Sequence, residues 1–155
     1  MTSTDPLAPS ADSDQQELIS ALVRASFATT AVLSRVAAEH DLSLTQLRVF
    51  GILRDRRIRM SELADYLGLD KSTISGLVDR AEKRGLLKRA PSPADGRATD
   101  VFLSAEGRQL AELGERKIAA SLSPMTGKLT RAETRRLTAL LEYVLDQEGS
   151  GPSGA

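Results

Sequence analysis

A segment near the middle of the chain most constrains the fold. Residues 60–85 read MSELADYLGLDKSTISGLVDRAEKRG. Ala64 is small enough for two helices to cross closely, and Gly68 permits a left-handed turn between them. Ile74 follows at a spacing that lets it pack the second helix onto the first, and apolar residues flank it at helical spacing. The pattern predicts two short helices joined by a tight turn, which is a helix-turn-helix.

The second helix of this pair is expected to run from a cap at Asp70 to residue 84, with Gly85 just beyond its end. Helical geometry turns four apolar residues inward: Ile74, Leu77, Val78 and Ala81. The outward face carries hydroxyls and a glycine near the N-terminus, so it can approach base edges in a major groove. An ordinary solvated face would look similar at any single residue. The turn glycine and the hairpin that follows favour the reading as a DNA-recognition helix.

A short hairpin is expected after Gly85. Residues 86–89 and 99–104 are strand candidates, and the connection between them holds two prolines and the turn pair Asp95-Gly96. Arg97 lies beside this turn, where it can enter a narrow minor groove. The alternative is a surface arginine paired with Asp95, and both readings can hold together. Further basic residues are candidate phosphate contacts: Arg54, Arg56, Arg57, Arg59, Lys88 and Arg89.

Helical periodicity extends to both sides of this region. A first helix is expected over residues 14–40, opened by a Ser13/Gln16 capping box, and a second ends near Arg54 after the same spacing at Ser43 and Gln46. Ser104 is expected to cap a fifth helix, which Pro124 and Gly127 interrupt. Thr130 and Glu133 are expected to open a sixth. Residues 1–12 and 149–155 are expected to be flexible tails. The predicted order is α-α-α-α-β-β-α-α, a mainly α (α+β) fold.

The composition excludes several functions. The chain has no cysteine and a single histidine, His40, so disulfides, thiolate sites, histidine-rich metal sites and a His-based triad are not expected. No nucleophile–base pair or phosphate-cradling loop is evident, so we expect no enzyme, cofactor or metal. No signal peptide or apolar run long enough to span a bilayer is recognised. We therefore expect a cytoplasmic, nucleoid-associated protein that does not bind a membrane.

Charge is distributed unevenly along the chain. The net charge is zero, but residues 42–104 hold twelve Lys or Arg and eight Asp or Glu, a surplus of +4. The remaining residues therefore carry −4. Local charge, rather than the total, decides whether a phosphate backbone is attracted. The basic middle segment favours double-stranded DNA as the partner. A winged-helix protein-interaction module without DNA binding is the alternative.

Three stretches resemble the MarR (multiple antibiotic resistance regulator) family: LSLTQLRVFGIL, MSELADYLGLDKSTISGLVDRAEKRGLLKR and DGRATDVFLSAEGR. The resemblance implies a winged helix-turn-helix over residues 42–104, with dimerisation helices at residues 13–41 and 105–148. It also implies DNA contacts from the recognition helix and the wing. Gly76 stands where relatives often carry arginine, so base readout there is expected to be weaker or differently placed. The expected DNA-contacting residues are Arg57, Lys71, Ser72, Thr73, Ser75, Gly76, Arg80, Lys88, Arg89, Asp95 and Arg97.

The terminal helices carry apolar stripes that a small winged-helix core leaves without partners. Packing on a second copy would cover them and supply the two-fold symmetry of a pseudo-palindromic operator. The expected interface residues are Leu18, Leu22, Leu137, Leu140, Leu141 and Val144. The resemblance further implies a repressor that a small molecule releases, and an apolar or anionic aromatic compound is the expected class. The candidate ligand-binding residues are Arg24, Phe27, His40, Phe50 and Leu53.

Overall fold

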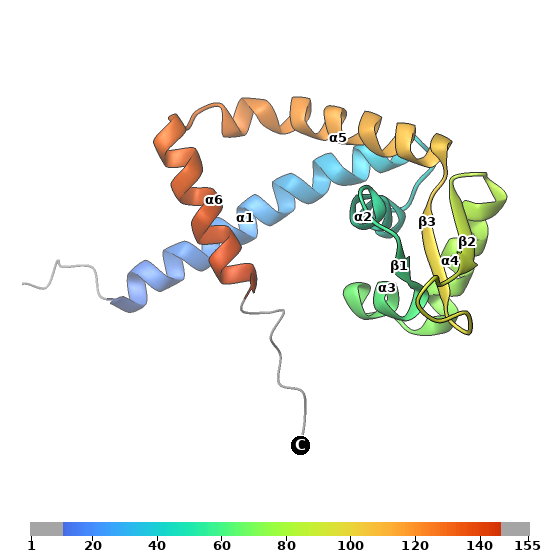
Figure 1. The fold of residues 1–155 in the computed structure, drawn as a ribbon. Coiled ribbons are helices and arrows are strands. Elements are labelled where there is room, and N and C mark those ends of the chain that lie inside the picture. The colour runs from blue at the N-terminus through green and yellow to red at the C-terminus, as the bar shows by residue number, and fades with distance from the viewer. Residues whose placement is uncertain (1–10, 147–155) are drawn as a thin grey trace, which may run out of the picture. The chain divides into compact units, whose positions relative to one another are not determined.

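The computed structural model describes residues 11–146, which form six helices and three short strands within that range (Figure 1). Of the tails expected at residues 1–12 and 149–155, residues 1–10 and 149–155 lie outside the described part, and the expectation is wrong for Ala11 and Asp12, which are helical. In chain order the elements are α1 (Ala11–Ala38), α2 (Leu44–Leu53), β1 (Ile58–Arg59), α3 (Met60–Leu67), α4 (Lys71–Lys83), β2 (Leu87–Pro91), β3 (Thr99–Leu103), α5 (Ala105–Thr126) and α6 (Arg131–Asp146). The predicted mainly α fold is confirmed, with one strand more than expected.

The chain divides into two compact units, residues 1–118 and residues 119–155. The first unit contains α1 to α4, the sheet and the beginning of α5. The second contains the end of α5 and all of α6.

The sheet is antiparallel, with the strand order β1-β3-β2. β2 pairs with β3 from Leu87 opposite Leu103 to Pro91 opposite Thr99. These are the two strands expected from the sequence, each displaced by one or two residues. β1 was not expected, and it pairs Ile58 with Val101. A two-residue strand shows no alternation of apolar and polar residues, so periodicity does not reveal it.

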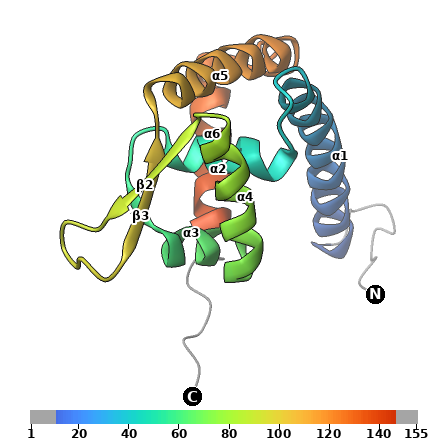
Figure 2. The same cartoon turned by 90° about the vertical axis from the view of Figure 1, so that its right-hand side faces the viewer.

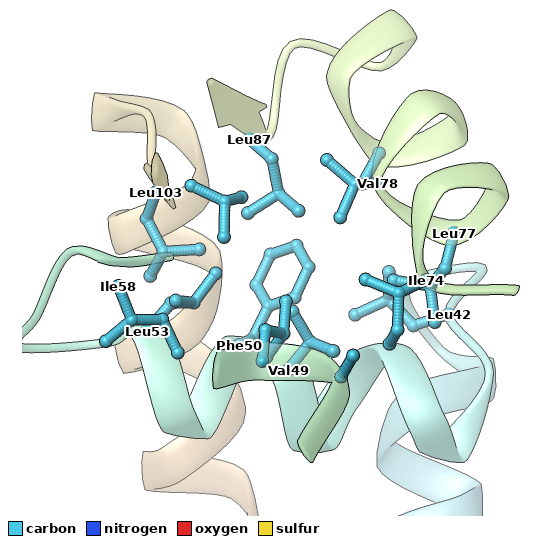
Figure 3. Close-up of a cluster of buried hydrophobic side chains, with 14 of the residues drawn as sticks. Leu42, Val49, Phe50, Leu53, Ile58, Ile74, Leu77, Val78, Leu87 and Leu103 are labelled. Carbon is cyan, nitrogen blue, oxygen red and sulfur yellow. The ribbon is translucent and has the colours of Figure 1, made fainter. Parts of the chain in front are cut away.

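The core of the first unit gathers around Phe50, whose side chain is buried (Figure 3). Buried aliphatic side chains from α2, α4 and all three strands surround the ring. The four residues of α4 expected to point inward are all buried: Ile74, Leu77, Val78 and Ala81. Burial of this apolar face fixes α4 on the core and leaves its opposite face exposed.

Several helix ends follow the predicted capping chemistry. Ser43 and Gln46 form a capping box at α2, with hydrogen bonds of 3.1 and 2.8 Å. Thr130 and Glu133 form another at α6, and the Thr130 backbone and hydroxyl hydrogen bonds lower the pKa of Glu133. The cap expected at Ser13 is wrong, because α1 already includes Ala11.

The expected break at Pro124 is also wrong, because this residue lies inside α5, which continues to Thr126. Proline lacks the N–H that a helix interior uses, but in the last turn this removes only one hydrogen bond. Gly127 follows directly after the helix, as expected.

The N-terminal helix differs from the sequence analysis in one further respect. By length and composition α1 is long and apolar enough to cross a membrane, although no such apolar run was expected from the sequence. Between residues 18 and 34 its only charged side chain is Arg24. At its C-terminal end α1 packs on α2 and buries Val36 and Ala37. Farther toward the N-terminus the large apolar side chains are exposed, among them Leu18, Leu22 and Phe27.

Candidate nucleic-acid interface

α3 and α4 meet at the predicted turn. Gly68 ends α3 with φ 62° and ψ 33°, the left-handed conformation that glycine adopts without steric strain. The next residue continues the turn, with the Leu69 N–H donating to the Ala64 carbonyl at 3.1 Å. Ala64 and Ile74 are 5% and 1% exposed, so the helices cross as the small and aliphatic residues predict. The helix-turn-helix is confirmed.

The N-terminus of α4 is closed by Asp70. Its carboxylate accepts hydrogen bonds from the Ser72 hydroxyl at 2.6 Å, the Thr73 N–H at 2.9 Å and the Thr73 hydroxyl at 2.8 Å. These hydrogen bonds hold the pKa of the Asp70 carboxyl far below its usual range, and the bond from the Ser72 hydroxyl has the largest effect. Each hydroxyl has one hydrogen to donate, and both hydrogens are directed to Asp70. Ser72 and Thr73 therefore present oxygen lone pairs to a partner.

Most of the α4 residues that were expected to contact DNA are exposed to solvent. Lys71, Ser72 and Thr73 are exposed, as is Arg80, while Ser75 and Gly76 are partly buried. A Cβ added at Gly76 would lie 3.5 Å from Nη1 of Arg80. The Arg80 guanidinium thus lies beside the position where relatives often carry an arginine, and it supplies a cation to the same part of the helix surface.

Arg89 on β2 contacts α4. Its Nη2 donates to Asp79 at 2.5 Å and to the Ser75 carbonyl at 3.2 Å, and its Nη1 lies 3.5 Å from Glu82. The Arg89 backbone N–H also donates to Glu82. Two carboxylates therefore already partner the guanidinium that was expected to contact phosphate. Lys88, the preceding residue, is exposed.

Arg57 makes a comparable set of contacts at the other side of the sheet. Its Nε donates to Asp100 at 2.8 Å, its Nη2 donates to the Pro91 carbonyl at 2.8 Å, and the guanidinium lies 4.8 Å from the Phe102 ring centre. The Asp100 side chain is only 8% exposed. Arg57 thereby joins the segment after α2 to both strands of the hairpin.

The loop between β2 and β3, residues 92–98, extends beside α3 and α4 (Figure 2). Ser92 donates its N–H to Ala98, and Ala98 donates its own to the Asp95 carbonyl. The Asp95 carboxylate accepts the backbone N–H of Arg97 at 3.1 Å. The Arg97 side chain is exposed, and within residues 11–146 it forms no ion pair. Asp95 thus orders the loop without neutralising Arg97.

The chain turns at Asp95-Gly96, as expected. The connection between the strands is the seven-residue loop 92–98, shorter than the expected connection over residues 90–98. The hydrogen bond from the Ala98 N–H to the Asp95 carbonyl closes the turn at its tip.

An open cavity of about 610 Å³ lies between α1, α2 and the beginning of α5. Its lining is mainly aliphatic, with Leu33, Leu47 and Ile118 among the contributors, and Arg54 and Glu115 meet at its edge through a 2.5 Å ion pair. We call it the apolar cavity. Side chains from two consecutive helices, α1 and α2, and from the distant α5 form it.

The five candidate ligand-binding residues are not brought together. Phe50 lines the apolar cavity, whereas Arg24 lines a shallow groove along α1 and Phe27 is 72% exposed. Leu53 belongs to the core and also lines a second, smaller cavity at the C-terminal end of α2. His40 follows α1, and its Nε2 is buried without a hydrogen-bond partner in the described part of the chain.

The contacts of Arg57 lead to a prediction about the hairpin. Arg57→Gln removes the ion pair and leaves the nearly buried Asp100 carboxylate without its cation. We expect the free energy of unfolding to fall by about 1–3 kcal/mol and DNA affinity to fall with it. Urea denaturation and fluorescence anisotropy measure the two effects. Asp100→Asn, which keeps an acceptor for Arg57, is the milder companion variant. Equal stability of Arg57→Gln and the wild type would show that these contacts do not hold the hairpin to the segment after α2.

Comparison with known proteins agrees with this geometry. The MarR family profile matches residues 40–98. The chain is 32% identical over 113 residues to the HTH-type transcriptional repressor IacR of Pseudomonas putida, covering 72% of this chain and 68% of the relative. A mutant MarR from E. coli in complex with operator DNA shares the fold, with TM-score 0.67, 23% identity and coverage of 88% of this chain and 99% of that one. CouR from Rhodococcus jostii RHA1, bound to p-coumaroyl-CoA, also shares the fold, with TM-score 0.71, 22% identity and coverage of 88% of this chain and 95% of that one. The profile match, the relative IacR and the helix-turn-helix with its hairpin together place this chain in the MarR family of winged helix-turn-helix transcriptional regulators.

Proposed function

We propose that this chain is a homodimeric repressor of transcription that binds a pseudo-palindromic operator and is released by a small molecule. The observation that carries the proposal is the exposed N-terminal face of α4 next to a hairpin loop with an unpaired, exposed arginine. Binding a recognition helix in the major groove and a basic wing in the minor groove requires that an exposed helix face and a basic hairpin loop are both available to DNA. Proteins of this family are DNA-binding regulators, and the chain is not an enzyme.

Within residues 42–104, the proposed DNA contacts come from two places. The recognition helix contributes Lys71, Ser72, Thr73, Ser75, Gly76 and Arg80. The hairpin contributes Lys88, Asp95 and Arg97. Because Ser72 and Thr73 direct their hydrogens to Asp70, they favour partners that donate hydrogen bonds, such as the amino groups of cytosine and adenine. Arg57 and Arg89 are assigned to positioning, since carboxylates already bind their guanidinium groups.

The proposed dimer is formed by the two terminal segments, residues 13–41 and 105–148. Leu18 and Leu22 on α1 are 53% and 42% exposed. On α6, Leu137, Leu140, Leu141 and Val144 are between 40% and 54% exposed. Apolar stripes of this size need to be covered. A second copy covers them and relates two recognition helices by a two-fold axis, whereas insertion of α1 in a bilayer would conflict with the burial of its C-terminal end on α2.

The apolar cavity is the proposed effector site. Its aliphatic lining suits an apolar or aromatic body, and the arginines at its rim suit an anionic substituent. CouR, a structural neighbour, was crystallised with the thioester p-coumaroyl-CoA. Operator DNA makes the cytoplasm, in association with the nucleoid, the proposed location.

The proposal predicts loss of operator affinity when the DNA-facing side chains are removed. A duplex selected from a random pool should show two half-sites about 10 bp apart. Arg97→Ala is expected to weaken binding to it by about ten-fold and Ser72→Ala by less, with unchanged folding. Gel shifts at several salt concentrations measure this, and the wild-type affinity should fall steeply with salt.

Arg135→Ala, which removes an exposed arginine from α6, is the matched control and should leave the affinity unchanged. Unchanged affinity of both Arg97→Ala and Ser72→Ala would contradict the proposed interface. Failure of the wild type to retain any duplex at low salt would favour a protein-interaction module instead.

A further inference from the structure

A second cavity, of about 370 Å³, adjoins the apolar one at the C-terminal end of α2. Four arginines line it: Arg54, Arg56, Arg57 and Arg108. Leu53, Phe102 and Leu103 contribute apolar surface, and Asp55 is the single carboxylate in the lining. We call it the arginine cavity. It lies wholly within the first unit, and it shares Arg54 and Arg56 with the apolar cavity.

Two of the four guanidinium groups have carboxylate partners, and two do not. Arg54 pairs with Asp55 and Glu115, and Arg57 pairs with Asp100. In the described part of the chain, Arg56 and Arg108 have no carboxylate within 4.0 Å. Arg56 lies 5.8 Å from the Tyr66 ring centre, and Arg108 donates to the Leu103 carbonyl. Like charges that lie close together repel, so an anion between them would be favoured.

The lining of the arginine cavity is distinct from the recognition helix and from the hairpin loop. No residue of α4 or of the loop 92–98 lines it. Leu103 and Arg108 lie at the end of β3 that is remote from this loop, whereas the Arg57 guanidinium reaches Asp100 and Pro91 at the loop end of the hairpin. The cavity therefore adjoins the hairpin without including the proposed DNA contacts of α4 and of the loop.

We propose that the arginine cavity binds a phosphate or other multiply charged anionic group of the effector, while the adjoining apolar cavity takes its apolar part. This inference rests on the proposed function, because it assigns a chemical class to the regulator's ligand. Guanidinium groups bind phosphate through paired, charge-assisted hydrogen bonds. Arg56, Arg57 and Arg108 are exposed, so an anion reaches them from solvent.

Arg57 links this cavity to the DNA-binding hairpin. It donates to Asp100 on β3 and to the Pro91 carbonyl on β2, at the two sides of the hairpin. An anion in the cavity competes with both acceptors for the same guanidinium. Its binding weakens the attachment of the hairpin to the segment after α2, and so lowers the affinity for DNA. By linkage, bound DNA opposes binding of the anion.

The test uses inorganic pyrophosphate as the probe for the charged group and full-length protein at constant ionic strength. Isothermal titration calorimetry of the wild type should detect binding. Arg56→Gln and Arg108→Gln should each weaken it by about ten-fold or more. Arg116→Gln, an exposed arginine farther along α5, removes the same charge outside the cavity and should leave it unchanged. Circular dichroism confirms that each variant is folded.

Absence of pyrophosphate binding by the wild type, or an equal loss in Arg116→Gln, would overturn the proposal. A loss of operator affinity in Arg56→Gln and Arg108→Gln as large as that in Arg97→Ala, with no anion present, would also overturn it and assign these arginines to DNA phosphates. Phenyl phosphate, which joins an apolar ring to the anion, should lower operator affinity at smaller concentrations than pyrophosphate. Because calorimetry needs no DNA, the cavity is tested even if the wild type binds no operator.

Discussion

Gly107→Ala is expected to destabilise the protein more than alanine at any other glycine within residues 11–146. A Cβ at Gly107 would lie 2.0 Å from the Leu86 carbonyl oxygen and 3.3 Å from the Leu103 side chain. The nearer contact is with backbone, which has no rotamer through which to move away. The first turn of α5 must therefore separate from residue 86. We expect the free energy of unfolding to fall by about 3 kcal/mol or more, a large part of the 5–15 kcal/mol typical of a domain.

The surrounding hydrogen bonds explain why α5 comes so close to residue 86. Ser104 caps α5 by accepting the Gly107 N–H at 3.0 Å, and its hydroxyl lies 2.6 Å from the Gly85 carbonyl, to which it donates. The Ser104 N–H donates to Leu86 at 3.0 Å. One serine thus fixes the start of α5 on the turn after α4. Displacing the helix would break these contacts as well as relieve the clash.

Urea denaturation followed by circular dichroism measures this loss. Gly114→Ala is the matched control, since it lies on the same buried side of the same helix. The nearest atom to its added Cβ would be Leu47 Cδ1 at 3.8 Å, an ordinary contact. Alanine also favours a helix over glycine, so this variant should be neutral or more stable by up to about 1 kcal/mol. If Gly107→Ala were as stable as Gly114→Ala, the close approach of α5 to Leu86 would be wrong.

Local signals in the sequence were sufficient for the helix-turn-helix and for most helix ends. Ser43, Asp70 and Thr130 cap their helices through residues no more than three positions away, so the interaction can be read from short spacing. Gly68 adopts the left-handed conformation that its position between two apolar runs predicts. In each case the physical cause and its effect lie within one turn of chain.

The sequence did not predict interactions between distant segments. Arg57 and Asp100 are 43 residues apart, and nothing near either one identifies the other as its partner. Gly107 looked like an ordinary helical residue, because the Leu86 carbonyl that excludes a side chain belongs to another element. The candidate ligand-binding residues were chosen by their position along the helices. The apolar cavity depends instead on which faces of α1, α2 and α5 meet, and of the five only Phe50 lines it.

Leu140→Asp is expected to have the largest effect on function. Leu140 is 54% exposed in the single chain and lies in the apolar stripe of α6. In the proposed dimer this stripe is buried against a second copy, and an unpaired carboxylate there is strongly unfavourable. We expect the variant to be monomeric. In a dimer, binding of one recognition helix to the first half-site holds the second helix near the other half-site at a high effective concentration. A monomer has only one recognition helix and loses this advantage, so operator affinity should fall by about 100-fold or more.

Ala139→Asp is the matched control, because it adds the same charge to the neighbouring position on the opposite side of α6. It should remain dimeric and bind the operator as the wild type does. Light scattering after size-exclusion chromatography gives the mass, and anisotropy with a two-half-site duplex gives the affinity.

A duplex with one half-site distinguishes weak binding caused by loss of the dimer from weak binding caused by damage to the DNA-binding region. The monomeric variant should bind it as the wild type does, since the first unit, which carries α4 and the hairpin, is unchanged. A Leu140→Asp protein that stayed dimeric and kept its affinity would show that the stripe on α6 is not the dimer interface.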